Sequence, residues 1–279
     1  MPVAVIDIGT NTTRLLVAEV EDGEVVELER RTTITSLGQG VDATGRLAQD
    51  AMDRVTEAIA VYREVIDRLG AERVVALATS AVRDAENGAA FREFLKERFG
   101  IQATTISGDE EARLTFLGAT GSRNDDRETL VIDIGGGSTE YVVGLPGRDP
   151  SFHVSTQMGS VRFTERYATL EELAAAVSEM VPAVSVEQGI AVAGTATSLA
   201  AIDGAEEVHG YRLSLATCER IVAMLAALTV EQRRDVKGLH PDRAPTIVAG
   251  AVILTESIRS FGLREIEVSA RDILHGAAL

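Results

Sequence analysis

A short motif occurs twice in this chain, with similar neighbours each time. Asp7-Ile-Gly-Thr-Asn-Thr closes one apolar run, and Asp133-Ile-Gly-Gly-Gly-Ser-Thr closes another, 126 residues later. A hydroxyl pair stands at the end of each copy, Thr12-Thr13 in the first and Ser138-Thr139 in the second. Two unrelated strand–turn–strand units could resemble each other by chance, but a shared tripeptide and hydroxyl pair at one offset favour an internal structural repeat.

The segments around the two motifs alternate between strand and helix patterns. Strands are predicted at residues 3–8, 15–20, 25–34, 73–78, 102–106, 130–134 and 141–145, and helices at 48–69, 90–99, 110–117 and 215–228. The polar, glycine-containing stretch 118–127 is predicted to be a domain junction. We therefore predict an α/β protein of two domains, 1–118 and 119–279, whose last helix could pack back on the first domain.

Composition restricts the class of function. The net charge of −16 argues against nucleic acid as a partner, and any phosphate site must be a local positive patch or use a metal ion. The N-terminus lacks the basic region of a signal peptide, and no apolar run approaches the roughly 18 residues that span a bilayer. The only cysteine, Cys218, is predicted to be a packing residue. The expected location is the cytoplasm, away from membranes.

Both copies of the motif have the composition of a phosphate-binding loop. Glycines allow a sharp turn whose successive N–H groups can bind an anion, and hydroxyls add donors. Asp7 and Asp133 end their strands, where they could hold a hydrated divalent cation such as Mg²⁺. Neither copy is a Walker loop or a dinucleotide loop. The alternative is a pair of hairpin turns that merely require glycine.

Further strings show a resemblance to a known family. They are Ala78-Thr-Ser-Ala-Val-Arg83-Asp-Ala-Glu-Asn, Ile106-Ser-Gly-Asp-Glu-Glu111-Ala-Arg, Met158-Gly-Ser-Val-Arg, Ala193-Gly-Thr-Ala-Thr and Asp242-Arg-Ala. With the two loops, and in this order, they resemble the exopolyphosphatase/guanosine pentaphosphate phosphohydrolase (Ppx/GppA) family of the actin, sugar kinase and heat-shock ATPase superfamily. The resemblance implies two ribonuclease-H-like domains with an interdomain cleft.

The resemblance also implies roles for individual residues. Glu111 is expected to be the catalytic base, and Arg83 and Glu140 to be catalytic as well, Arg83 by contacting the terminal phosphate. Glu140 and Asp133 are expected to hold metal or water, and Asp7 is a further candidate because of its position at a strand end. Without the family match, Glu111 reads as an acid at a solvated helix N-terminus, favoured there by the helix dipole. The residues expected to bind substrate phosphate are Gly9, Thr10, Asn11, Thr12, Gly135, Gly136, Gly137, Ser138, Thr139, Gly194, Thr195 and Arg243.

The resemblance implies a Mg²⁺-dependent exopolyphosphatase, with a monovalent cation as a possible second cofactor and a homodimer as the expected assembly. Because the chain ends at Leu279, without the extra helical domains of long family members, we expect activity on shorter polyphosphate chains. Three alternatives stay open: a guanosine pentaphosphate (pppGpp) phosphohydrolase, a phosphotransferase of the same superfamily, and a non-catalytic sensor of polyphosphate or an alarmone.

Overall fold

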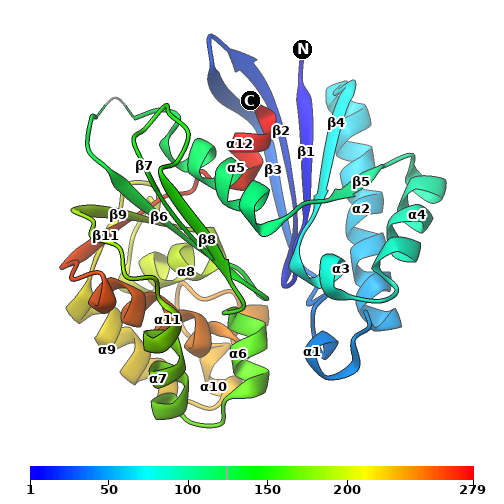
Figure 1. Cartoon of the computed structure of the whole chain (residues 1–279). Helices are drawn as coiled ribbons and strands as arrows, with labels where there is room; N and C mark the ends of the chain where they lie inside the picture. Colours follow the sequence, from blue (N-terminus) through cyan, green and yellow to red (C-terminus); the bar gives the residue numbers. More distant parts are fainter. Residues whose placement is uncertain (124) are drawn as a thin grey trace. The chain divides into compact units, whose positions relative to one another are not determined.

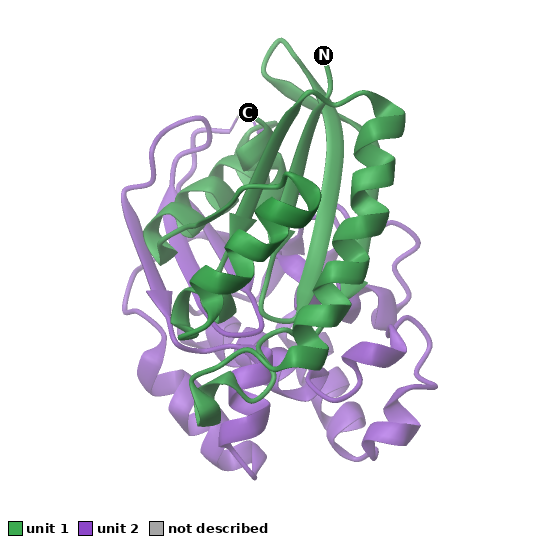
Figure 2. Ribbon diagram, turned by 90° about the vertical axis from the view of Figure 1, so that its right-hand side faces the viewer, with its two compact units in different colours: residues 1–122, 273–279 green, residues 123–272 purple. Residues whose placement is uncertain are grey.

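The computed structural model describes residues 1–123 and 125–279. Packing divides the chain into two compact units, unit 1 (residues 1–122 and 273–279) and unit 2 (residues 123–272), which are coloured separately in Figure 2. The sequence places the domain boundary at 118/119, whereas the packing division falls at 122/123 and assigns the last helix to unit 1. Each unit is an α/β layer structure with its own sheet (Figure 1).

Unit 1 contains a five-stranded sheet in the order β3-β2-β1-β4-β5. Its strands are β1 (Val3–Ile8), β2 (Thr12–Glu21), β3 (Glu24–Ile34), β4 (Arg73–Ala78) and β5 (Ala103–Thr105). Its helices are α1 (Val41–Thr44), α2 (Gln49–Leu69), α3 (Ser80–Asp84), α4 (Gly88–Phe99), α5 (Gly108–Thr120) and α12 (Ile273–Ala278). The first three strands are antiparallel to one another, and β4 and β5 continue parallel to β1.

Unit 2 contains a six-stranded sheet in the order β10-β11-β9-β6-β7-β8. Its strands are β6 (Thr129–Ile134), β7 (Thr139–Gly144), β8 (Phe152–Thr156), β9 (Gln188–Val192), β10 (Arg212–Ser214) and β11 (Glu265–Val268). Its helices are α6 (Ser160–Arg166), α7 (Leu170–Met180), α8 (Ala193–Asp203), α9 (Leu215–Ala226), α10 (Val230–Arg233), the 3₁₀ turn Pro241–Arg243 and α11 (Ile247–Ser260).

The two sheets follow the same plan. Read from the outer hairpin strand inwards, β8-β7-β6-β9-β11 repeats the order and direction of β3-β2-β1-β4-β5, with β10 added at the far edge. The structure therefore confirms the predicted internal repeat and the expected pair of ribonuclease-H-like domains. The motif that opens each copy sits at the turn between the first two strands of its sheet.

Layers of apolar side chains cover both faces of the unit 1 sheet. All six residues of β1 are buried. Ala4, Ile6 and Ile8 point to the side covered by α2, while Val3 and Val5 pack with Leu114 of α5 and with Ile273 and Leu274 of α12. A central strand that is apolar on both sides is typical of a sheet sandwiched between helices, and it fixes the position of Asp7 at the end of that strand.

Local signals account for most element boundaries. Asp22 and Gly23 both have positive φ, 51° and 83°, as a two-residue hairpin between β2 and β3 requires. Gly70 ends α2 in the left-handed conformation, as predicted. Residues 118–120 of the stretch predicted to be the junction form the last turn of α5. Residue 124 of that junction lies outside the described residues.

The extension of α5 has a packing cause. A Cβ on Gly276 of α12 would lie 1.9 Å from the carbonyl oxygen of Leu114 and 3.1 Å from the nitrogen of Gly118. The backbones of α5 and α12 therefore approach closely at a pair of glycines. Gly118, which in the sequence resembles the start of a loop, is a contact residue inside a helix.

Candidate active site

The repeated motif forms the same turn in both units. In unit 1 the N–H of Gly9 donates to the carbonyl of Thr12 at 3.1 Å, and in unit 2 the N–H of Gly135 donates to the carbonyl of Ser138 at 3.0 Å. The residues that face each other across the two strands are also equivalent: Asp7 opposes Arg14 on β2, and Asp133 opposes Glu140 on β7. The two units therefore share the backbone conformation of this turn, but the residue opposite the aspartate is positively charged in unit 1 and negatively charged in unit 2.

In unit 1 the aspartate is neutralised by its neighbour. The Nε and Nη2 atoms of Arg14 lie 2.9 and 2.6 Å from Oδ2 of Asp7, and both side chains are largely buried. A fork of two charge-assisted hydrogen bonds is strong and fixes the orientation of both groups. One carboxylate oxygen of Asp7 is thus engaged inside the protein, which leaves this residue less able to act as the metal ligand that the sequence predicts.

In unit 2 two carboxylates oppose each other instead. Asp133 is 6% exposed and Glu140 is 1% exposed, and the hydroxyl of Ser155 on β8 donates to Oε1 of Glu140 at 2.7 Å. Like charges directly across a strand pair repel, and the repulsion is strong in a buried setting. A cation placed near these groups would relieve that repulsion. Asp133 and Glu140 therefore remain the best candidates for a cation site.

Two carboxylates match what Mg²⁺ requires of a protein better than they match a metal that is enclosed by protein ligands alone. Within residues 1–123 and 125–279 no group of three or more His, Cys, Asp or Glu side chains is arranged to hold a metal ion. Mg²⁺ typically binds one or two carboxylates and completes its shell with water and substrate phosphate oxygens. A pair consisting of Asp133 and Glu140 matches that requirement.

The glycine loop of unit 2 turns its carbonyl groups to one side. The carbonyl of Gly135 accepts from the N–H of Ser160 at 2.9 Å, and that of Gly136 accepts from Val161 at 2.9 Å. The carbonyl of Gly137 accepts from Nε of Arg162 at 2.8 Å. All of these donors belong to the start of α6.

Because the C=O of one residue and the N–H of the next point in opposite directions across a trans peptide, the N–H groups of Gly136, Gly137 and Ser138 point away from α6. No acceptor for them is found in the part of the chain that the structure describes. Three successive donors on one side of a turn form an anion-binding nest.

The loop of unit 1 is held in a similar way. The carbonyl of Thr10 accepts from the N–H of Gly38 at 2.7 Å, and that of Asn11 accepts from Thr35 and Ser36, both at 3.0 Å. The hydroxyl of Thr10 accepts from the N–H of Ala81 at the start of α3, at 3.2 Å. The carbonyl groups of this loop again face their own unit, which leaves the opposite side of the turn for a ligand.

Arg83 and Glu111 of unit 1 come together although 28 residues separate them. Nη1 of Arg83 lies 3.5 Å from Oε2 of Glu111 and donates to the carbonyl of Ile106 at 3.0 Å. Both side chains are mostly buried, at 23% and 12% exposure. Arg83 also lies 3.6 Å from Asp84. The arrangement places a guanidinium group beside a carboxylate, as a phosphate-binding arginine and a water-orienting base would be placed.

The neighbouring acid, Glu110, points elsewhere. It forms two hydrogen bonds with Arg113, at 3.0 and 2.9 Å, on the solvent-exposed side of α5. The hydrogen bonds from Arg113 hold the pKa of Glu110 below its ordinary value. Adjacent residues on a helix diverge by about 100°, so only one of the two acids can approach Arg83. The structure places Glu111 in that position.

The first turn of α8 follows β9 directly and carries Gly194 and Thr195. Val192 of β9 pairs with Asp133 of β6. Gly194 and Thr195 therefore lie just beyond the carboxyl end of β9, at the same end of the sheet as Asp133. A Cβ on Gly194 would lie 2.1 Å from both Nη atoms of Arg243, so the guanidinium of Arg243 rests directly on the glycine. The structure thus brings together three of the residues that the sequence assigns to phosphate binding.

The structure adds residues that sequence reasoning did not single out. Arg162 and Ser160 hold the glycine loop of unit 2, and Ser155 holds Glu140. The string Met158-Gly-Ser-Val-Arg was part of the resemblance, yet nothing in it indicates which loop it contacts. Ala193, the first residue of α8, has φ of 64°, which is unusual for a residue with a side chain, and it immediately precedes Gly194.

Comparisons with known proteins bear on the family and the fold. Residues 16–279 match the model of the Ppx/GppA phosphatase family. Exopolyphosphatase 2 of Mycobacterium tuberculosis is 36% identical, over 99% of this chain and 97% of that protein. The crystal structure of an exopolyphosphatase-like protein gives a TM-score of 0.91 at 32% identity, covering 99% of this chain and 96% of the other. That of an exopolyphosphatase from Cytophaga hutchinsonii gives 0.90 at 25% identity, with the same coverage.

In the described residues, the structure contains no helix that is both long and apolar enough to cross a membrane.

Proposed function

We propose that this chain, which belongs to the Ppx/GppA phosphatase family, is an exopolyphosphatase that hydrolyses the terminal phosphoanhydride bond of inorganic polyphosphate. The observation that carries the proposal is the pairing of Glu111 with Arg83 at 3.5 Å, in a unit that also carries a phosphate-type loop. A base beside a guanidinium group is suited to a reaction in which water attacks a phosphorus atom whose oxygens need positive charge nearby.

Glu111 orients the attacking water and accepts its proton. The water oxygen forms a bond to the terminal phosphorus while the bridging P–O bond breaks. One orthophosphate leaves, and the remaining chain is shorter by one unit and keeps the former bridging oxygen. Arg83 donates to the oxygens of the terminal phosphate, where its planar guanidinium can form two hydrogen bonds at once. Its contact with the Ile106 carbonyl fixes the position from which it does so.

The glycine loops bind the phosphates that are not cleaved. In unit 2 the N–H groups of Gly136, Gly137 and Ser138 supply donors in a fixed direction, since α6 holds the carbonyl side of the loop. Arg243, resting on Gly194, adds a positive charge to the same unit. These local donors matter because the net charge of the chain is −16, which disfavours a polyanion at long range.

Asp133 and Glu140 would hold Mg²⁺. When bound, the ion neutralises charge on substrate phosphate oxygens. The protein's own contribution is the buried carboxylate pair, with Ser155 fixing one oxygen of Glu140 by a hydrogen bond of 2.7 Å. We expect Glu140→Gln, which removes one negative charge, to raise the Mg²⁺ concentration needed for half-maximal activity by about tenfold. An unchanged Mg²⁺ requirement in that variant would exclude Glu140 as a ligand.

The test is a phosphate-release assay with polyphosphates of several lengths and with pppGpp, each with and without Mg²⁺. Glu111→Gln should lower the rate by about 100-fold or more, since general-base catalysis contributes factors of that size. The matched control is Glu110→Gln, the adjacent acid paired with Arg113, which should retain activity within about twofold because an exposed ion pair contributes little.

Full activity in Glu111→Gln would refute the assignment of the base. Release of phosphate from pppGpp, with no release from polyphosphate, would refute the proposal that polyphosphate is the substrate. Tight polyphosphate binding without turnover at any Mg²⁺ concentration would identify a sensor in place of an enzyme.

A further inference from the structure

A polar cavity lies in unit 2, away from the residues discussed above. It has a volume of about 470 Å³ and opens at the amino ends of β6, β9 and β11. Asp133 and Gly194 lie at the opposite, carboxyl ends of β6 and β9. A six-residue strand such as β6 spans about 20 Å, so the cavity and the glycine loop are separate sites of the same unit.

Charged side chains dominate the walls of this cavity. Four arginines line it, Arg123, Arg127, Arg212 and Arg264, together with three glutamates, Glu187, Glu265 and Glu267. Among the lining residues, four guanidinium groups therefore stand against three carboxylates. Asp125, which does not line the cavity, adds a fourth carboxylate that pairs with Arg123 at 3.1 Å. In a chain with a net charge of −16, such a concentration of arginine is a local departure from the overall field.

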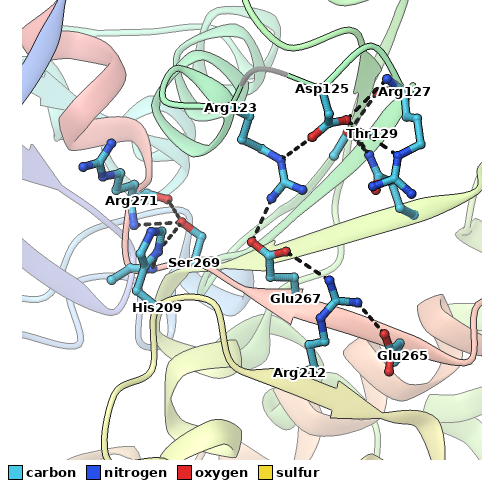
Figure 3. A network of polar contacts seen from close by, with 12 residues as sticks. Arg123, Asp125, Arg127, Thr129, His209, Arg212, Glu265, Glu267, Ser269 and Arg271 are labelled. Atoms are coloured by element: carbon cyan, nitrogen blue, oxygen red, sulfur yellow. Dashed lines mark hydrogen bonds and ion pairs between the residues drawn. The ribbon is translucent and has the colours of Figure 1, made fainter.

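Ion pairs fix part of this wall. Glu267 accepts from Nη1 of Arg123 at 2.8 Å and lies 3.9 Å from Nη2 of Arg212, which also pairs with Glu265 (Figure 3). Arg123 in addition donates to Asp125 at 3.1 Å. Each guanidinium has five N–H donors in a rigid fork, so these contacts orient Arg123 and Arg212 and leave further donors for a ligand.

Arg264 differs from the other three. It is exposed at the start of β11, and its side chain has no hydrogen bond or ion pair with any other residue that the structure describes. The guanidinium of Arg264, which lines the same cavity as the two oriented ones, therefore has all of its N–H donors available to a ligand. Guanidinium forks match the geometry of phosphate and carboxylate oxygens.

We propose that this cavity binds a small multivalent oxyanion, carrying phosphate or carboxylate groups, through Arg212 and Arg264. Its volume falls within the usual range of about 300–1,000 Å³ for small-molecule sites. Because it lies at the opposite end of the strands from the glycine loop, occupancy does not require the active site. The inference goes beyond the exopolyphosphatase proposal and does not depend on it.

The experiment follows backbone amide NMR signals while orthophosphate, pyrophosphate or citrate is added without Mg²⁺. Gly189 and Gly262 line the cavity and report on it, whereas Gly136 reports on the glycine loop. We expect the signals of Gly189 and Gly262 to shift and saturate in the wild-type protein. In Arg264→Ala the dissociation constant from these two signals should rise about tenfold, the usual effect of losing a charge-assisted hydrogen bond.

Arg148→Ala is the matched control, because Arg148 is another exposed arginine of unit 2 that lies outside the cavity. It should leave the dissociation constant unchanged. Saturation with orthophosphate and pyrophosphate only identifies a phosphate ligand, and saturation with citrate only identifies a carboxylate ligand. The proposal is overturned if no probe gives saturating shifts of Gly189 and Gly262, or if Arg264→Ala and Arg148→Ala bind equally well. Neither variant breaks a side-chain contact in the described structure, so both should fold.

Discussion

Substitution of Gly194 tests the placement of Arg243 without touching Arg243 itself. In Gly194→Ala the new methyl group would lie 2.1 Å from both Nη atoms and 2.2 Å from Cζ of Arg243. Ordinary van der Waals contact begins at 3.4 Å, so the guanidinium must retreat by at least about 1.3 Å. The three nearest atoms all belong to the far end of a flexible side chain, so we expect the methyl group to be accommodated mainly by movement of Arg243.

The expected result is therefore a loss of activity with little loss of stability. If Arg243 contacts substrate phosphate, a displacement of this size removes a hydrogen bond to a charged group, worth about 1.5–3 kcal/mol. That corresponds to a fall in kcat/KM of about 10- to 150-fold. The assay is phosphate release from a polyphosphate of defined length, and urea unfolding should show a free-energy change within about 0.5 kcal/mol.

Comparison with Arg243→Ala completes the test. The double variant should be no less active than Arg243→Ala alone, because the methyl group acts only by displacing the guanidinium. Wild-type activity in both single variants would refute the role given to Arg243. Additive losses in the double variant would show that Gly194 acts independently of Arg243, for example through its own backbone.

Three further predictions follow from buried contacts. In Gly159→Ala the methyl group would lie 2.2 Å from the carbonyl oxygen of Gly136, so the glycine loop must shift. We expect the free energy of unfolding, measured with urea, to fall by about 1–3 kcal/mol and kcat/KM to fall about 100-fold. Tyr141→Phe removes a buried hydrogen bond of 2.6 Å to Ser257 and should lower the free energy of unfolding by about 1–2 kcal/mol. Burial raises the pKa of the Cys218 thiol from 9.0 to about 12, so a thiol reagent at pH 8 should label only unfolded protein. The free energy of unfolding should fall as the pH rises from about 9 towards 12, because the thiol ionises first in the unfolded chain.

The repeat could be predicted from sequence because both of its copies are local. Each copy is a strand, a glycine turn and a second strand, and the turn is closed by a single hydrogen bond between Gly9 and Thr12 or between Gly135 and Ser138. Patterns of this kind depend on a few neighbouring residues. The position of the loops at the ends of central strands follows from the same apolar runs that identify the strands.

The contacts between distant segments could not be predicted in the same way. Arg162 reaches the carbonyl of Gly137 across 25 residues, and Arg243 rests on Gly194 across a longer separation. Nothing in the residues near Arg162 indicates that partner, since it depends on where α6 starts relative to the sheet. The distinction between Glu110 and Glu111 could be predicted only in part. Helix geometry requires the two side chains to diverge, but only the packing of α5 shows which of them contacts Arg83.

The residue opposite the repeated aspartate is Arg14 in unit 1 and Glu140 in unit 2. Two loops with the same backbone hydrogen bond therefore differ in charge. Where Arg14 faces Asp7, the aspartate has a positive charge beside it within the protein, and we expect the loop to offer its backbone and hydroxyl donors to an anion without a cation. Where Glu140 faces Asp133, two buried carboxylates oppose each other, and a cation near them would favour the binding of an anion beside them. The glycine loop of unit 2 is therefore expected to bind phosphate together with a cation, while that of unit 1 can bind phosphate alone.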